Sequence, residues 1–487
     1  MIRNFPVQPL VLIFTSFAFI AQVRALEAAG ENRPLQLHPK NPHYLLFRGR
    51  PTILIGSTEH YGAVMNLDFD YIKYLDATRR DGMNVTRTFS GTYHEIPGSF
   101  GITDNTLSPK RYLGPWARTE TAGAADGGNK FDLKKFDPAY WDRLKDFVAQ
   151  AGKRGIVVEY VLFCPFYDEN LWKVNPMNAA NNINAIGACP RTEVYTLKHA
   201  DLVAVHDAFT REAVRQLNGF DNLYFEICNE PYFGGVTEQW QAHIAQAIVD
   251  TEKDLPNKHL IAQNIANDRK KVDKPDPNVS IFNFHYATPP ETVAMNYGLN
   301  KVIADDETGF RGKEDVHYRT EAWDFIIAGG AIYDNLDYSF TPGHPDGTLI
   351  DFKSPGGGGA ELRKQLLILR KFMDEFDFIR MTPMNSAVKG GAITATISGN
   401  PPTANATVRV LGQAGRAYAI YIRGGSAAEL MIELPAGRYQ AAWVNTRTGN
   451  VDKSEQINHS GGRAKLTSPE YQQDVALRLR ATAPPGP

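Results

Sequence analysis

The sequence predicts an α/β protein: a (β/α)₈ TIM barrel followed by a small antiparallel β-sandwich domain. Short β-rich runs alternate with amphipathic helical stretches from about Pro51 to Tyr338. Several of these runs are apolar throughout, which is typical of parallel strands covered on both faces. From about Ser386 the pattern changes to alternating strands punctuated by Gly and Pro. A chain of 487 residues is long enough for both domains.

Eight runs have the length and composition of barrel strands. They are Thr52–Gly56, Asn84–Phe89, Ile156–Phe163, Leu223–Cys228, Leu260–Gln263, Ser280–His285, Val302–Ala304 and Ala331–Leu336. Their alternation with helical stretches favours a closed βα barrel, and a doubly wound open sheet is the main alternative.

The predicted helices carry ordinary start and stop signals. Asp137-Pro138 begins a helix that reaches Lys153, with Gly155 just beyond it. Asp201–Leu217 and Thr237–Glu252 have the same apolar periodicity. A last helix follows the glycines at 356–359 and ends near Glu375, which would close the barrel.

The first residues resemble an export signal. Arg3 provides a positive charge, Leu10–Ala21 is a short apolar run, and Val23-Arg24-Ala25 provides small residues for cleavage. We therefore expect a signal peptide at 1–25, a barrel domain at 26–380 and a sandwich domain at 381–487. The apolar run is too short for a membrane span, so the mature protein is expected to be secreted or periplasmic.

Composition excludes some partners. The formal net charge is −2, so no global field favours nucleic acid or an anionic membrane. The 3 cysteines include no Cys-x-x-Cys pair, which argues against a cysteine-bound metal. Export would permit a disulfide, for which Cys164–Cys189 is the preferred pair, with Cys228 as a buried thiol. Composition does not indicate an oligomeric state.

Two long segments follow predicted strands. Gly91–Lys130 comes after the second strand and Pro165–Leu197 after the third. Both therefore belong to the C-terminal rim, where barrel active sites are assembled. Segments of this length are usually lids or walls of a binding site, and surface insertion is the alternative.

Acidic residues end two of the predicted strands. The fourth strand ends in Asn229-Glu230-Pro231, and the seventh runs into Asp305-Asp306-Glu307. The tips of strands 4 and 7 face each other across the mouth of a closed barrel. Retaining hydrolysis of a glycoside needs two carboxyl groups about 5–5.5 Å apart. One carboxyl must be protonated to assist the leaving oxygen, and the other must be ionised to attack the anomeric carbon.

This ordered pattern resembles the clan A glycoside hydrolases, a group of cellulase-like and apiosidase-like barrels. Their strand 4 ends in Asn-Glu-Pro and their strand 7 in Glu-x-Gly, as here at Glu307-Thr-Gly309. Gly82-Met-Asn-Val-Thr-Arg87 is similar to their strand 2, and Ser280-Ile-Phe-Asn-Phe-His-Tyr286 to their strand 6. The resemblance covers about Ile53 to Tyr338.

The resemblance implies a retaining hydrolase of β-linked poly- or oligosaccharides that needs no metal and no cofactor. Glu230 would be the acid/base and Glu307 the nucleophile. Asn229 would bind the sugar 2-hydroxyl, and Arg87 would hold Glu307 ionised. The remaining substrate-binding candidates are Tyr286, which would donate to Glu307; His285, which would bind substrate or the acid/base; and Trp323 and Tyr338, which would form a stacking floor.

Several assignments have alternatives. Strand alternation places Asp305 and Glu307 on one face and Asp306 on the other, and Gly309 favours Glu307 as the nucleophile. His285 and Tyr286 could equally be core residues. Other interior or rim candidates are Glu226, which could support Arg87, and Glu59 and His60, which could reach substrate.

The C-terminal domain resembles the β-sandwich modules that follow apiosidase-like barrels. We expect it to stiffen the barrel, with Trp443 in its core.

Two other functions compete with hydrolysis by retention. A metal-dependent barrel hydrolase would want His-x-His at the end of strand 1, where the chain has a single histidine. A glycan-binding barrel without turnover is the other alternative.

Overall fold

The computed structural model describes residues 33–59, 61–394 and 406–482. The predicted signal peptide and His60 lie outside the described residues. Within these ranges, no helix is both long and apolar enough to cross a lipid bilayer.

Eight parallel strands form the barrel that the sequence predicts, so the fold class is confirmed. They are β4 (Leu54–Thr58), β5 (Val85–Phe89), β8 (Val157–Phe163), β9 (Leu223–Cys228), β10 (Ile261–Asn267), β11 (Ile281–His285), β12 (Val302–Thr308) and β13 (Ile332–Leu336). Hydrogen-bonded neighbours follow the order β4-β13-β12-β11-β10-β9-β8-β5. The first strand begins two residues later than predicted because Thr52 instead pairs with Leu45 in a separate sheet.

The seam between β4 and β5 is closed largely by one side chain. Asn84 Nδ2 donates to the Ile53 carbonyl and Asn84 Oδ1 accepts from the Ile55 amide. The Asn84 amide adds one backbone bond to the Ile55 carbonyl at 3.2 Å. The asparagine side chain thus replaces the backbone ladder that joins the other neighbouring strands.

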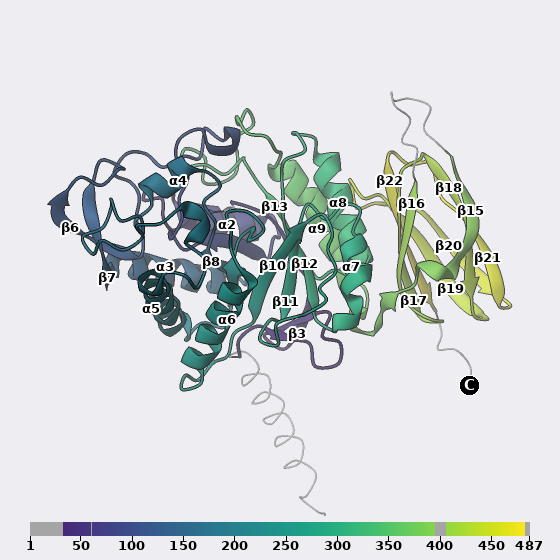
Figure 1. Ribbon diagram of the computed structural model, residues 1–487. Coiled ribbons are helices and arrows are strands. Elements are labelled where there is room, and N and C mark those ends of the chain that lie inside the picture. The colour runs from purple at the N-terminus through teal and green to yellow at the C-terminus, as the bar shows by residue number, and fades with distance from the viewer. Residues whose placement is uncertain (1–32, 60, 395–405, 483–487) are drawn as a thin grey trace, which may run out of the picture.

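Helices surround the barrel (Figure 1). They are α2 (Tyr71–Arg80), α3 (Pro138–Lys153), α4 (Glu169–Val174), α5 (Ala200–Leu217), α6 (Glu238–Glu252), α7 (Glu291–Asn296), α8 (Asp315–Ile327) and α9 (Ala360–Asp374), with 3₁₀ turns at Ser99–Gly101, Arg191–Glu193, Tyr297–Leu299, Phe378–Arg380 and Asn385–Ala387. The predicted start of α3 is confirmed, since the Asp137 side chain caps it and Pro138 occupies its first turn.

Two small sheets accompany the barrel. One contains β1 (Gln36–Leu37), β2 (Leu45–Phe47) and β3 (Arg50–Thr52). The other is a hairpin of β6 (Trp116–Ala122) and β7 (Asn129–Phe136), which the sequence analysis did not anticipate inside the long segment after the second strand.

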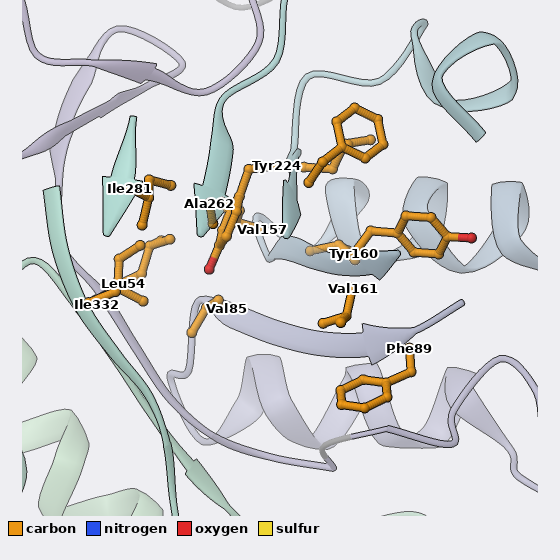
Figure 2. Close-up of a cluster of buried hydrophobic side chains, with 14 of the residues drawn as sticks. Leu54, Val85, Phe89, Val157, Tyr160, Val161, Tyr224, Ala262, Ile281 and Ile332 are labelled. Atoms are coloured by element: carbon orange, nitrogen blue, oxygen red, sulfur yellow. The ribbon is translucent and has the colours of Figure 1, made fainter. Parts of the chain in front are cut away.

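The barrel interior is layered. Side chains alternate along each strand, so every second residue points inward. Leu54, Val85, Ile281 and Ile332 come from four strands and gather in an apolar layer (Figure 2). The next inward positions towards the strand ends are polar and buried; they are Arg87, Glu159, Glu226, Asn283 and Asp334. Charge is therefore concentrated directly below the rim.

The C-terminal domain is a sandwich of a six-stranded and a three-stranded antiparallel sheet. Its strands are β14 (Thr382–Pro383), β15 (Val388–Thr394), β16 (Thr407–Gln413), β17 (Ala417–Arg423), β18 (Ala427–Leu434), β19 (Gly437–Val444), β20 (Val451–His459), β21 (Gly462–Thr467) and β22 (Asp474–Ala481). Trp443 is fully buried among aliphatic residues, so its predicted core role is confirmed.

The sandwich packs against α8 of the barrel (Figure 1). Trp323 of α8 stacks on Tyr421 of β17, with ring centroids 5.6 Å apart. Arg319 Nη2 lies 2.6 Å from Asp474 Oδ1 in a buried ion pair across the same interface. Because it is covered by both domains, α8 is buried on nearly all sides even though it carries several charged residues.

Candidate active site

A cavity of about 440 Å³ opens where the strands end. Its wall combines acidic and aromatic side chains from the barrel strands and from the long segments that follow β5 and β8. The lining residues are Phe89, Tyr93, Glu95, Phe100, Ile102, Cys164, Tyr167, Asn229, Glu230, Phe233, Asn267, Tyr286, Glu307, Phe310, Arg311 and Leu336. Four of the predicted site residues line this cavity, and Arg87 and His285 contact them from below, an arrangement suited to a sugar pocket.

Glu230 and Glu307 meet in this cavity although 77 positions separate them in the chain (307 − 230). One carboxylate oxygen from each and one ring nitrogen of His285 all lie within 4.8 Å of one another. Both glutamates are largely buried, with exposed fractions of 8% and 7%. This limit applies to the nearest oxygens of the two side chains and is close to the carboxyl separation of about 5–5.5 Å that double displacement at one anomeric carbon requires.

Glu230 stands at the end of β9 on a strained turn. Its φ is +37°, which is rare for a residue with a side chain. Tyr167 Oη donates to Glu230 Oε2 at 2.6 Å, Tyr232 Oη donates to Oε1 at 3.3 Å, and His285 Nδ1 lies 3.4 Å from Oε1. Burial alone would raise the pKa of Glu230, but His285, with Tyr167 and Asn267, outweighs burial and lowers it.

Glu307 is held from two sides. Arg87 Nη1 donates to Glu307 Oε2 at 2.6 Å, and Tyr286 Oη donates to Oε1 at 2.7 Å. Arg87 is fully buried, so its charge is not screened by solvent. A short bond from a guanidinium and a second from a phenol fix the direction of the carboxylate.

The other terminal nitrogen of Arg87 binds two residues in and just beyond β9, which β8 separates from β5. Arg87 Nη2 donates to Glu226 Oε1 at 3.0 Å and to Asn229 Oδ1 at 2.5 Å. Asn229 Nδ2 donates in turn to Tyr167 Oη at 2.9 Å. One arginine thus connects both predicted catalytic strands.

The acids at 305–307 do not alternate as the sequence predicts. The register between β11 and β12 shifts so that Phe284 pairs with Asp305 and His285 with Glu307. Asp306 is the extra residue of this β-bulge, and both Asp306 and Glu307 approach His285 inside the barrel. Asp305 instead lies towards Glu321 of α8. The predicted pairing of Asp305 with Glu307 on one face is therefore wrong.

A second group of acids lies below the cavity. Single oxygens of Glu159, Glu226 and Asp306 are within 4.8 Å of one another, and all three residues are buried. Burial and the neighbouring carboxylates raise the pKa of Glu159 well above its ordinary value and that of Glu226 to about 7. Arg87 and His285 lower the pKa of Asp306 despite its burial.

Among the described residues, these two acidic groups have the spacing of metal ligands. Arg87 contacts Glu307 in the upper group and Glu226 in the lower one, and a buried guanidinium opposes a divalent cation at either place. The residues of both groups therefore fit a divalent cation poorly.

Two predicted substrate residues lie elsewhere. Trp323 is fully buried between Phe372 and Tyr421 at the domain interface, so its prediction as a stacking floor is wrong. Tyr338 is 5% exposed and packs beside Phe310 and Phe352, behind the cavity wall. It therefore supports the wall and does not form a floor.

The cysteines and the first strand end also differ from expectation. Cys164, Cys189 and Cys228 are all free thiols, so the preferred Cys164–Cys189 disulfide is wrong. Cys164 lines the cavity and accepts a weak bond from Asn229. The Glu59 carboxylate accepts hydrogen bonds from the backbone amides of Gly62 and Ala63. It therefore stabilises a turn and does not line the cavity.

Sequence reasoning missed several lining residues, above all Tyr167 and Glu95. Tyr167 contacts both Asn229 and Glu230, and only its place in a long rim segment could have indicated it. Glu95 also lines a neighbouring cavity of about 750 Å³ at the β6–β7 hairpin. Burial and the charges of Glu307 and Glu59 raise the pKa of Glu95 to about 8.

Comparison with known proteins rests on structure alone, since no family model and no curated protein sequence matches the chain. A putative glycoside hydrolase from Bacteroides vulgatus ATCC 8482 superposes with a TM-score of 0.63 at 13% identity over 93% of this chain and 83% of its own. The chain shares its fold with glycoside hydrolases. A family 5 glycoside hydrolase from the same organism gives 0.62 at 14% identity over 93% and 94% of the two chains. A further glycoside hydrolase gives 0.60 at 15% identity over 93% and 97%. In each comparison the match covers most of both chains, so it includes barrel and sandwich together.

Proposed function

We propose that the chain is a retaining glycoside hydrolase that cleaves β-linked O-glycosidic bonds of oligo- or polysaccharides through a covalent glycosyl-enzyme. The observation that supports this most is the meeting of Glu230 and Glu307 within 4.8 Å in a rim cavity. That spacing leaves room for one anomeric carbon and is smaller than the gap that an inverting enzyme needs for its water.

Glu307 is the nucleophile of the proposed reaction. Arg87 and Tyr286 hold its carboxylate by one hydrogen bond to each oxygen, and Glu307 lines the cavity. Attack on the anomeric carbon forms an ester with Glu307 as the aglycone leaves. When water later hydrolyses this ester and releases the sugar, Tyr286 and Arg87 again donate hydrogen bonds to the Glu307 carboxylate.

Glu230 is the acid and later the base. It donates a proton to the leaving oxygen in the first step and takes one from water in the second. Asn229 is oriented by Arg87 and Tyr167, which leaves one lone pair of its Oδ1 for a sugar 2-hydroxyl. His285 contacts both carboxylates from below.

Two features support a carbohydrate larger than a single sugar. The aromatic residues Tyr93, Phe100 and Phe233 give the cavity apolar faces suited to sugar rings. The neighbouring cavity, which shares Glu95, provides space for further units. We also propose that the enzyme acts outside the cytoplasm, on the basis of the export-like N-terminal sequence.

The proposed function is tested by incubating the purified protein with a panel of aryl β-glycosides and β-linked oligosaccharides, with and without a chelator. Chelator-insensitive turnover with a retained anomeric configuration, followed by NMR, is expected. Chelator-sensitive turnover would favour a metal-dependent hydrolase, and binding without turnover would favour a glycan-binding barrel.

The nucleophile can be tested by substitution. Glu307→Ala is expected to lower kcat by roughly 10⁴-fold or more, because the covalent route is lost. Azide should partly restore turnover and yield a glycosyl azide of inverted configuration. Full activity in this variant would assign the nucleophile elsewhere.

The acid can be tested by its dependence on the leaving group. Glu230→Gln is expected to slow glycosides with poor leaving groups by roughly 10²- to 10⁴-fold, because these need a proton at the departing oxygen. Activated aryl glycosides should lose far less in their glycosylation step. Equal losses on both substrate types would contradict an acid role.

A further inference from the structure

We propose that Asp306 is a positioning residue that holds His285 as an imidazolium, and that His285 is the resting site of the proton which Glu230 delivers to the substrate. This inference rests on the proposed function, because it explains where the proton that Glu230 gives to the leaving oxygen comes from. It concerns Asp306, which the sequence pattern placed on the opposite face of its strand from Glu307.

The β-bulge in β12 provides the geometry. It brings two consecutive acids, Asp306 and Glu307, to the same ring. Asp306 Oδ1 lies 3.2 Å from His285 Nε2. On the other edge of the ring, His285 Nδ1 lies 3.4 Å from Glu230 Oε1 and 3.6 Å from Glu307 Oε1. The imidazole therefore bridges Asp306 to both proposed catalytic carboxylates.

His285 is fully buried, and nearly all the charge around it is negative. The titratable groups nearest to it are Glu226 on β9, Glu230 just beyond β9, Asp305, Asp306 and Glu307 on β12, and Arg87 on β5, the cation that pairs with Glu226 and Glu307. Burial alone would lower the pKa of His285, but Glu307, Asp306 and Glu230 outweigh burial and raise it well above the ordinary value.

Asp305 and Asp306 are consecutive residues whose pKa values are shifted in opposite directions. Burial raises the pKa of both, but Arg87 and His285 outweigh it at Asp306, whose pKa is lowered. At Asp305 burial and the nearby Glu321 raise the pKa well above its ordinary value. Asp306 is therefore a carboxylate that can hold a cation, whereas Asp305 is a neutral acid outside the site.

The free enzyme rests with a charged His285 beside an ionised Glu230, in agreement with the lowered pKa of Glu230. A bound sugar removes water from Glu230 and raises its proton affinity. The proton then moves from His285 Nδ1 to Glu230 Oε1, which leaves a neutral imidazole.

The remaining steps return that proton. Glu230 gives it to the leaving oxygen as the C–O bond to the aglycone breaks and the C–O bond to Glu307 forms. Glu230 later takes a proton from water as the hydroxide oxygen attacks the anomeric carbon and the ester to Glu307 breaks. That proton returns to His285, so the cycle closes with no net gain or loss.

The test compares Asp306→Asn with Asp305→Asn. Both remove one carboxyl at a fully buried position, but only the first removes a charge. For Asp306→Asn, kcat/KM on glycosides with poor leaving groups should fall about tenfold or more, against less than about threefold on activated aryl glycosides. The alkaline limb of its pH profile should move down by about one unit or more. Asp305→Asn should match the wild type in both respects.

A second measurement needs no turnover. With ¹⁵N-labelled histidine, the His285 signal, assigned by its loss in His285→Gln, should show two protonated ring nitrogens in the free wild-type enzyme at pH 7. In Asp306→Asn the ring should become neutral at a lower pH than in the wild type. A neutral His285 in the wild type at pH 7 would overturn the proposal, even if the protein hydrolyses glycosides.

Two kinetic outcomes would also overturn it. Equal losses on poor and activated leaving groups in Asp306→Asn would show a structural role only. The same loss and the same pH shift in Asp305→Asn would show that any substitution in this strand disturbs the site. Failure of the wild type to hydrolyse any glycoside would instead count against the proposed function, while the ¹⁵N measurement still tests the state of His285.

Discussion

The interiors of the two domains are built in different ways. The sandwich core is almost entirely apolar, with Val410, Ile420, Ile432 and Leu477 packed around Trp443. The barrel has an apolar layer too, but above it Arg87, three acids and His285 are buried together. Both interiors exclude water, but the barrel also buries several carboxyl groups together with a guanidinium and an imidazole.

The difference concerns the free-energy cost of burying charge. Burying a charge costs free energy unless it is paired, so a core selected for stability alone tends to avoid it. The sandwich core follows that rule, and the sandwich packs against the barrel at α8. The barrel breaks it directly below the cavity, where shifted pKa values are useful for acid and base chemistry.

The largest expected effect on this difference between the two interiors comes from removing Arg87, the buried cation at the centre of the barrel. Arg87→Met should lower the free energy of unfolding by about 3–5 kcal/mol, because Glu226 and Glu307 keep their burial and lose their partner. Denaturant unfolding followed by circular dichroism measures this. The matched control is Arg80→Met, because the Arg80 side chain is 59% exposed and its partner Asp81 keeps Arg363 as a second cation; its loss should cost under about 1 kcal/mol. Equal effects would mean that the barrel charges carry no special cost.

A smaller effect should appear as a pH dependence at the cavity wall. Glu95 has a pKa raised to about 8 in the folded protein, so folding retains a proton that the unfolded chain releases above its ordinary pKa. Its contribution to stability is therefore present at low pH and is lost as pH rises towards about 8. Glu95→Gln cannot ionise and should become more stable than the wild type by pH 8–9.

Thermal unfolding from pH 4 to 9 measures this crossover. The exposed residue Glu120 on the β6 strand provides the control, since Glu120→Gln should leave the difference from wild type constant across the range. A wild type that loses no stability relative to Glu95→Gln as pH rises would contradict the raised pKa.

The smallest expected effect concerns the sandwich. Ile420→Val removes one buried methylene from an apolar core and should cost about 0.5–1.5 kcal/mol. Because no ionisable group is disturbed, kcat/KM and its pH profile should stay at wild-type values. A shifted pH profile in this variant would show that the two interiors are coupled.

The sequence predicted features that local patterns encode. The eight barrel strands follow from apolar runs, and Asn229 and Glu230 follow from the motif that ends the fourth strand. The predicted positions 87, 229, 285, 286 and 307 come together in the structure because the barrel closure brings the strand ends to one rim. Their roles remain proposals.

The failures have specific physical causes. Alternation misplaced Asp306 because a bulge depends on pairing with the neighbouring strand, which one strand's sequence does not show. Trp323 was misassigned because helix α8 is buried by a second domain as well as by the barrel. Tyr167 and Glu95 were missed because irregular rim segments have no periodicity. The β6–β7 hairpin did have a signal, the turn residues Asp126-Gly127-Gly128 between two alternating runs.

The interface between the sandwich and α8 also limits where the protein can be truncated. A truncation after residue 380 would expose Trp323 to solvent together with the apolar surface around it, and would leave Arg319 without Asp474. Exposed patches of this kind promote aggregation. Expression of the barrel by itself should therefore give insoluble material, and any shortened version intended for crystallisation has to keep both domains.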